Sequence, residues 1–176
     1  MNYTDRDAVE RIAKAYAFAP DDFQYMRDAD LHNMRKLIQA QFAYLSEKVY
    51  FDFVDNDPYP YVKIDELDAD WRRGIIKVNT SGNESALWGK VYNLQFRAIH
   101  DYIHCVHRLD FNYLSELKAF THQYEFSIMD RFAKQFPYMD WELYRRTIRS
   151  EIVYQAAVKE HYEQFHIDQK IILKDL

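Results

Sequence analysis

Two histidines that stand one helical turn apart are the residues of this chain best suited to chemistry. They lie in the stretch 96–107, FRAIHDYIHCVH, where His100, His104 and His107 share an arc of roughly 60° on a helix. Imidazoles at i and i+4 can bind one transition metal, as they do in zinc peptidases. Those enzymes carry glutamate where this chain has Asp101, whose shorter side chain we expect to orient a ligand histidine. The spacing predicts His100 and His104 as metal ligands, and it places His107 at the helix end or on the surface.

Two later segments each place a carboxylate and an amide on one helical face. Glu116 shares such a face with Gln123, and Glu151 shares one with Gln155. Because these faces also carry apolar residues, the polar side chains need partners there. If both faces meet the histidines, two His and two Glu form a ligand set for Zn, Fe or Mn. The sequence predicts catalytic roles for Glu116, Glu151 and Asp101, and a supporting role around the ligands for Gln123 and Gln155.

The same histidines have a second interpretation that needs no metal. His100 and His104 border an apolar face, so they can be core-edge residues that hydrogen-bond to carboxylates. The polar cluster is then a buried network that sets the register of the helices. In that case the protein is a non-enzymatic factor that binds a host or viral protein, and its 15 tyrosines suit such an interface.

A third arrangement is that of the His-Asp phosphohydrolases, which need an early histidine, a His-Asp pair and a late aspartate. His32, then His100 with Asp101, then Asp130 or Asp168 follow that order. The long interval after His32 disfavours this class.

The charge of the chain argues against nucleic acid as a partner. The net charge is −5, and the densest basic sites are the pairs Arg72-Arg73 and Arg145-Arg146, whereas nucleic-acid binders usually carry a basic stripe. The single cysteine excludes an intramolecular disulfide and suits a reducing compartment. With no signal-peptide pattern and no apolar run of roughly 20 residues, the sequence predicts a cytoplasmic protein without a membrane span.

The elements that position these residues are predicted to be helices. The chain has 176 residues with three Gly, four Pro and 48% hydrophobic residues. So few glycines disfavour a β-sandwich or barrel, and they exclude the Gly-rich loops of P-loop and dinucleotide-binding enzymes. The composition therefore predicts an all-α fold, a single-domain bundle of about five helices over residues 1–176. All three glycines lie between Arg73 and Lys90, in a bend region that leads into the histidine helix.

Apolar periodicity sets the expected boundaries of the helices. Besides a short helix at 64–71, the five main helices are expected over 4–17, within 23–53, and over 85–107, 113–134 and 139–165. The run 74–80 is the only β-like one. Because one strand cannot form a sheet alone, we expect an irregular extended segment near residues 74–83. The apolar tail 167–176 is expected to dock on the helices.

Several blocks of the sequence are specific when taken together. They are DWRRGIIKVNT at 70–80, FRAIHDYIH at 96–104, LDF at 109–111, SELKA at 115–119, EIVYQ at 151–155 and DQK at 168–170. As a set they resemble a family of uncharacterised proteins of tailed phages and mobile elements, which also occurs as a module of large phage polyvalent proteins. The resemblance covers about residues 58–173, with the N-terminal helices 4–53 packed on that region.

The resemblance implies a common polar site rather than a known reaction. Its recurrent polar positions correspond here to His100, Asp101, His104, Glu116, Glu151, Gln155, Asp168 and Gln169. It places Asp168 and Gln169 with the groups that surround the ligands. It also implies a phage or prophage origin, and thus the cytoplasm of a host bacterium.

Overall fold

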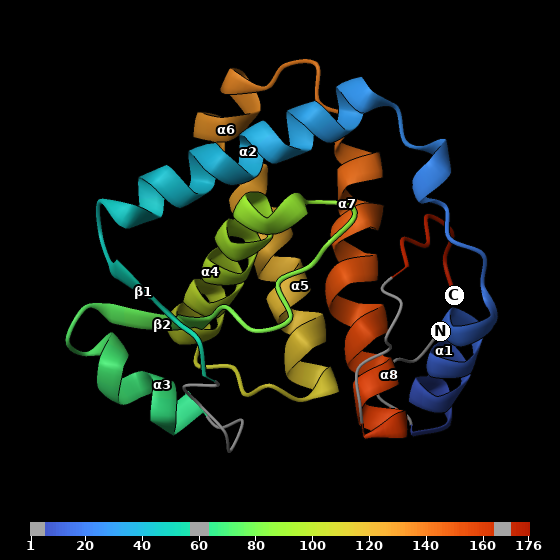
Figure 1. Cartoon of the computed structure of the whole chain (residues 1–176), viewed down its shortest axis with the longest axis horizontal. Coiled ribbons are helices and arrows are strands. Elements are labelled where there is room, and N and C mark those ends of the chain that lie inside the picture. The colour runs from blue at the N-terminus through green and yellow to red at the C-terminus, as the bar shows by residue number, and fades with distance from the viewer. Residues whose placement is uncertain (1–5, 57–63, 164–169) are drawn as a thin grey trace.

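Helices form most of the chain, and one small parallel sheet accompanies them (Figure 1). This computed structural model describes residues 6–56, 64–163 and 170–176. The helices are α1 (Arg6–Phe18), α2 (Asp28–Ser46), α3 (Ile64–Trp71), α4 (Gly89–His107), α5 (Tyr113–Ser127), α6 (Asp130–Gln135), α7 (Trp141–Arg149) and α8 (Gln155–Tyr162). A 3-10 turn covers Phe23–Tyr25, a π-helical turn covers Ser150–Tyr154, and the strands are β1 (Tyr50–Val54) and β2 (Ile75–Asn79). The prediction of a mostly helical fold is confirmed, but the fold is not purely all-α.

The sheet corrects the expectation of an unpaired extended segment. Strand β2 lies within the expected 74–83 region, but it pairs in parallel with β1, from Tyr50 opposite Ile75 to Val54 opposite Asn79. The sequence pattern placed the residues of β1 at the end of a long helix, whereas α2 ends at Ser46. Helix α3 connects the two strands, as a parallel pair requires. Gly74 takes a φ of +73° at the turn into β2, a conformation that a side chain would strain.

Two of the expected long helices contain an interruption. The expected helix over 113–134 is divided into α5 and α6, because buried Phe132 turns back to pack edge-on against Tyr44 and Phe126. The expected helix over 139–165 is continuous from α7 to α8, but its middle is the π-helical turn. One extra residue per turn rotates the faces on either side of it, and such turns are frequent at functional sites.

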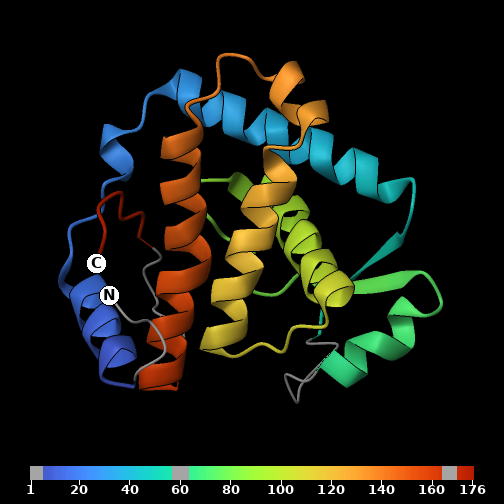
Figure 2. The same ribbon diagram turned by 180° about the vertical axis from the view of Figure 1, so that it is seen from behind.

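Helix α4 lies at the centre of the arrangement. Helix α2 crosses one end of α4 and α5, and the sheet and α3 flank α4 on the side away from α7 and α8 (Figures 1 and 2). The long helix made by α7, the π turn and α8 packs between α5 and α1 (Figure 2). The core therefore runs through both halves of the chain. No helix in the described ranges is long and apolar enough to cross a lipid bilayer.

The last described segment, 170–176, docks on α1 and the π turn, as its apolar composition predicts. Ile171 and Ile172 are buried. The Tyr16 hydroxyl accepts a hydrogen bond from the backbone N–H of Lys170 at 2.7 Å and donates one to its carbonyl at 2.9 Å. The Ser150 hydroxyl likewise donates to the Lys170 carbonyl at 3.0 Å. The tail therefore braces the π turn from the outside of the molecule.

Candidate metal centre

Helix α4 brings the two imidazoles together. His100 and His104 lie one turn apart, with ring centroids 4.5 Å apart, and their Nε2 atoms are separated by 3.0 Å. The His104 side chain is fully buried, and 17% of the His100 side chain is exposed. The i and i+4 spacing thus produces the pair that the sequence predicts.

The end of α4 orients His104. Arg108 takes a left-handed conformation, with a φ of 51°, that turns the chain back on the helix. Its guanidinium is held by Asp68 at 2.9 Å. The turn places the Leu109 carbonyl 3.0 Å from Nδ1 of His104, while Phe111 stacks on the imidazole with a centroid distance of 4.3 Å. A carbonyl can only accept, so Nδ1 carries the proton and Nε2 is left with a lone pair.

Helix α5 supplies the carboxylate and the second orienting group. Asn112 caps this helix by accepting from the Ser115 N–H, and Glu116 follows in the first turn, where the helix dipole favours a negative charge. Gln123 lies two turns further on the same face. Its Oε1 accepts from Nδ1 of His100 at 3.0 Å, which leaves Nε2 of His100 pointing at Glu116.

Three acceptor atoms converge at this place. Oε2 of Glu116 lies 2.9 Å from Nε2 of His100 and 3.4 Å from Nε2 of His104. Since each Nδ1 atom donates to its own acceptor, the three converging atoms are left as acceptors that a proton or a metal ion must bridge. A zinc ion about 2.0–2.1 Å from each of three tetrahedral ligands would separate them by about 3.3 Å. His100, His104 and Glu116 accordingly form a group of the size and composition that can hold a metal ion.

The charges of the cluster are strongly coupled. Burial opposes a charge on His100, but the Glu116 carboxylate outweighs it and raises the pKa of His100 to about 9. Burial would likewise raise the pKa of Glu116, but the charge of His100 and hydrogen bonds to both histidines lower it to about 2. In the absence of metal, one proton shared by His100 and Glu116 therefore satisfies the cluster near neutral pH.

A cavity of about 710 Å³ lies beside the cluster. His100 and Glu116 line it, whereas His104 is not among its lining residues. The wall also includes Asp101, Glu151 and Gln155. A metal at the cluster would therefore have its fourth position on the cavity side.

The carboxylates outside the cluster differ from the predicted four-ligand set. Within the described residues, Glu151 and Asp101 do not belong to the group of His100, His104 and Glu116 that could hold a metal ion. Both carboxyls are in the cavity wall, where burial raises the pKa of Asp101 to about 6 against the charges of the two histidines. Burial also raises the pKa of Glu151 to about 7, although the indole N–H of Trp88 and the charge of Arg97 both lower it. Gln155 donates to Glu151 at a long 3.4 Å rather than to a ligand histidine.

The partners that orient the histidines also differ from the prediction in part. Gln123 holds His100 from the position that the sequence indicated. The expected orienting role of Asp101 is taken by Gln123 and by the Leu109 carbonyl, which occupy the two Nδ1 atoms. The Leu109 carbonyl could not be predicted, because the left-handed turn before it is made by an arginine and not by the usual glycine. Asp168 and Gln169 lie outside the described residues.

The further residues of the phosphohydrolase arrangement and the two basic pairs do not belong to the cluster. In the part of the chain that the structure describes, neither His32 nor Asp130 belongs to the metal-sized group, and exposed Asp130 pairs with Lys134. The arginines of both basic pairs form ion pairs with neighbouring carboxylates: Arg72 with Asp68, Arg73 with Asp70, and Arg145 and Arg146 with Glu142.

Comparisons of this chain with protein-family models, with curated proteins and with solved structures found no match. The resemblance to a phage family therefore stays a prediction from the sequence blocks, and the interpretation of the site depends on its geometry.

Proposed function

We propose that this protein binds one divalent transition metal, Zn, Fe or Mn, through His100, His104 and Glu116, and that the metal serves hydrolysis. The observation that supports it best is the convergence of three acceptor atoms within 3.4 Å of one another. Such an arrangement needs a cation between the acceptors, either a proton or a metal ion. Two imidazoles and one carboxylate are the ligand set of several catalytic zinc sites.

The cavity favours a catalytic site over a purely structural one. Structural zinc sites use four protein ligands, whereas catalytic sites keep one position for water or substrate. Here three protein ligands lie at the edge of a cavity of about 710 Å³, which is large enough for a small molecule. A bound metal would lower the pKa of a coordinated water to about 7. Asp101 and Glu151 are the wall carboxylates, outside the cluster, that could take up its proton.

Metal titration with matched variants tests the binding part of this proposal. Zinc, manganese and iron are added in turn to chelator-treated protein, and stoichiometry and affinity are measured by calorimetry and elemental analysis. We expect one ion per chain for wild type and at least about 100-fold weaker binding for His104→Gln and Glu116→Gln. The controls are His122→Gln and Glu125→Gln, which change an exposed pair on the same helix as Glu116. Stoichiometry near zero for all three metals in wild type would refute the proposal.

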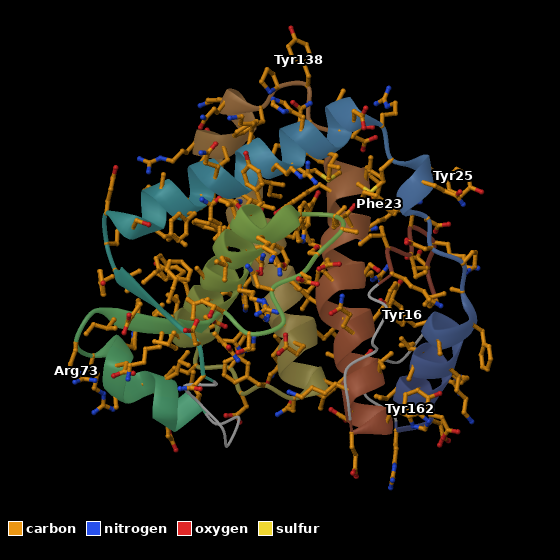
Figure 3. The ribbon with its side chains drawn as sticks, viewed as in Figure 1. Tyr16, Phe23, Tyr25, Arg73, Tyr138 and Tyr162 are labelled. Atoms are coloured by element: carbon orange, nitrogen blue, oxygen red, sulfur yellow. The ribbon has the colours of Figure 1, made fainter. Side chains whose placement is uncertain are left out.

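The non-enzymatic alternative has one observation in its favour. Several aromatic side chains are strongly exposed: Phe18 at 87%, Tyr25 at 72% and Tyr138 at 91%. Tyr25 and Tyr138 project away from the body of the molecule (Figure 3). Exposed tyrosines are typical of protein-binding surfaces. If no metal binds, a pull-down that retains the same host or viral protein with wild type and with His100→Ala, Glu151→Ala protein would support this alternative.

A further inference from the structure

The positive side chains in the cavity wall already have partners. Arg97 donates to the backbone carbonyls of Asn79, Ser81 and Gly82 at 2.8–3.0 Å. Lys77 pairs with Asp70 at 3.1 Å, and Lys159 also has a partner. None of these cations is therefore available to neutralise an anionic ligand without losing an existing interaction.

The groups of the wall that remain available include several hydrogen-bond acceptors. In the described part of the chain, the Glu151 carboxylate receives a long hydrogen bond from Gln155 and also interacts with the indole N–H of Trp88. Gln155 is 6% exposed and Asn93 is 5% exposed, so both amides are buried at the edge of the cavity. Each uses its N–H₂ group within the protein, Gln155 toward Glu151 and Asn93 toward Asn83 at 2.8 Å. Among the described residues, neither amide oxygen has a donor.

Amide oxygens that lie in the cavity wall without a protein donor are able to accept a hydrogen bond from a ligand. The wall also carries the carboxyl groups of both Asp101 and Glu151. A phosphate or carboxylate would bring more acceptors and more negative charge to a surface that offers acceptors.

We propose that the cavity binds a ligand that carries a primary ammonium group, which donates to Glu151 and to the amide oxygen of Gln155. An ammonium has three donors and no acceptor, which matches the groups that remain available. Phe96, Phe111 and Tyr113 in the wall would contact the apolar part of the ligand. As a substrate, the molecule would be an amine-bearing compound with a hydrolysable bond near the metal, which leaves Asp101 as the wall carboxylate for proton transfer.

The substrate role rests on the proposed function, but the binding of the ammonium does not. The test therefore uses chelator-treated protein without metal and three probes with the same four-carbon chain: n-butylamine, 1-butanol and butyrate. Binding is measured by ligand-observed NMR at about pH 8.5, above the Glu151 pKa of about 7, so that the carboxylate is charged. We expect n-butylamine to bind at least roughly tenfold more tightly than 1-butanol, and butyrate not to bind.

Matched variants locate the ammonium. Glu151→Gln keeps the shape of the side chain and removes its charge, so it should weaken n-butylamine binding roughly tenfold. Gln155→Met should weaken it less, and Glu125→Gln on the exposed surface should leave it unchanged. The far-UV circular dichroism of each variant shows whether the fold is retained. Equal binding of amine and alcohol, or an unchanged affinity in folded Glu151→Gln protein, would overturn the proposal.

A zinc titration of the same variants separates the two proposals. Glu151 is not one of the three predicted metal ligands, so Glu151→Gln protein should bind zinc like wild type. If zinc fails to bind while n-butylamine binds as expected, only the proposed function is contradicted. If zinc binds and the amine does not, the metal centre stands and the ammonium site is refuted.

Discussion

Metal binding to the cluster is expected to release about one proton near neutral pH. Without metal, the pKa of His100 is about 9 and that of Glu116 is about 2, so the pair holds one proton between these values. The Nδ1 atom of His100 donates to Gln123, so the proton that a metal must displace is the one on Nε2.

The size of the effect follows from the pKa of His100. About 1.5 pH units below that pKa, roughly 97% of the clusters carry the proton. Zinc affinity should therefore rise about tenfold, or about 1.4 kcal/mol, for each pH unit up to the His100 pKa of about 9. The raised pKa alone accounts for roughly a 50-fold difference in affinity between about pH 7 and about pH 9.

Calorimetry measures both quantities. Zinc is titrated at about pH 6.5, 7.5 and 8.5 in two buffers that differ in ionisation enthalpy, and the difference in apparent enthalpy gives the number of protons released. His122→Gln protein, in which the cluster is intact, should release the same number. A release between one and two protons would indicate that a bound water ionises as well. The reasoning is refuted if fewer than about half a proton is released and the affinity does not change with pH.

Three further outcomes follow from single contacts. Gln123→Ala removes the acceptor that orients His100 and should weaken zinc binding roughly 10–100-fold; an unchanged zinc titration would show that the imidazole needs no such support. Because the folded-state pKa of Glu151 is raised from 4.5 to about 7, its contribution to stability is present below pH 4.5 and is lost as the pH rises through about 7. Between pH 4.5 and about 7, wild type should therefore lose roughly 1–3 kcal/mol of unfolding free energy relative to Glu151→Gln. Urea titrations in which the unfolding free energies of both proteins change in parallel with pH would contradict this. Tyr16→Phe removes a hydroxyl that both accepts from and donates to Lys170, and it should lower the unfolding free energy by roughly 1–3 kcal/mol in urea; equal midpoints and slopes would mean that the tail does not need the hydroxyl.

The histidine pair could be predicted because it depends on one helix. The distance between residues four apart on an α-helix is set by backbone geometry and does not depend on the rest of the fold. His100 and His104 therefore meet as the sequence indicates. The same reasoning identified Glu116 and Gln123 as a polar pair on one face of α5, and the cluster contains both of them.

The choice between the two glutamates depended on how the helices pack. The sequence assigned Glu116 and Glu151 equivalent roles, because each lies on a partly apolar face near an amide. The π turn changes the rotation of the helix that carries Glu151, and this carboxyl lies in the cavity wall beside Gln155 instead of in the cluster. A π turn has no strong sequence signal, so local patterns cannot supply this rotation.

The parallel sheet was missed for a related reason. Strand β1 has apolar residues that also fit a continuing helix, and its partner β2 lies 25 residues further along the chain, Tyr50 opposite Ile75. Strand pairing is satisfied by hydrogen bonds from a distant segment, which periodicity within a window cannot show. The last residue of β2 and the loop after it hold three carbonyls that accept hydrogen bonds from Arg97.

By itself the sequence determined the helical class of the fold, the absence of glycine-rich phosphate loops, and the pair of imidazoles on one helix. These properties follow from composition and from geometry over a few residues. The tertiary structure alone decided that Glu116 completes the cluster, that the Leu109 carbonyl orients His104, and that a cavity rich in acceptors lies beside them. Those properties depend on the rotation and packing of helices that are distant in sequence, where many arrangements bury the same apolar faces and only one brings these polar atoms together.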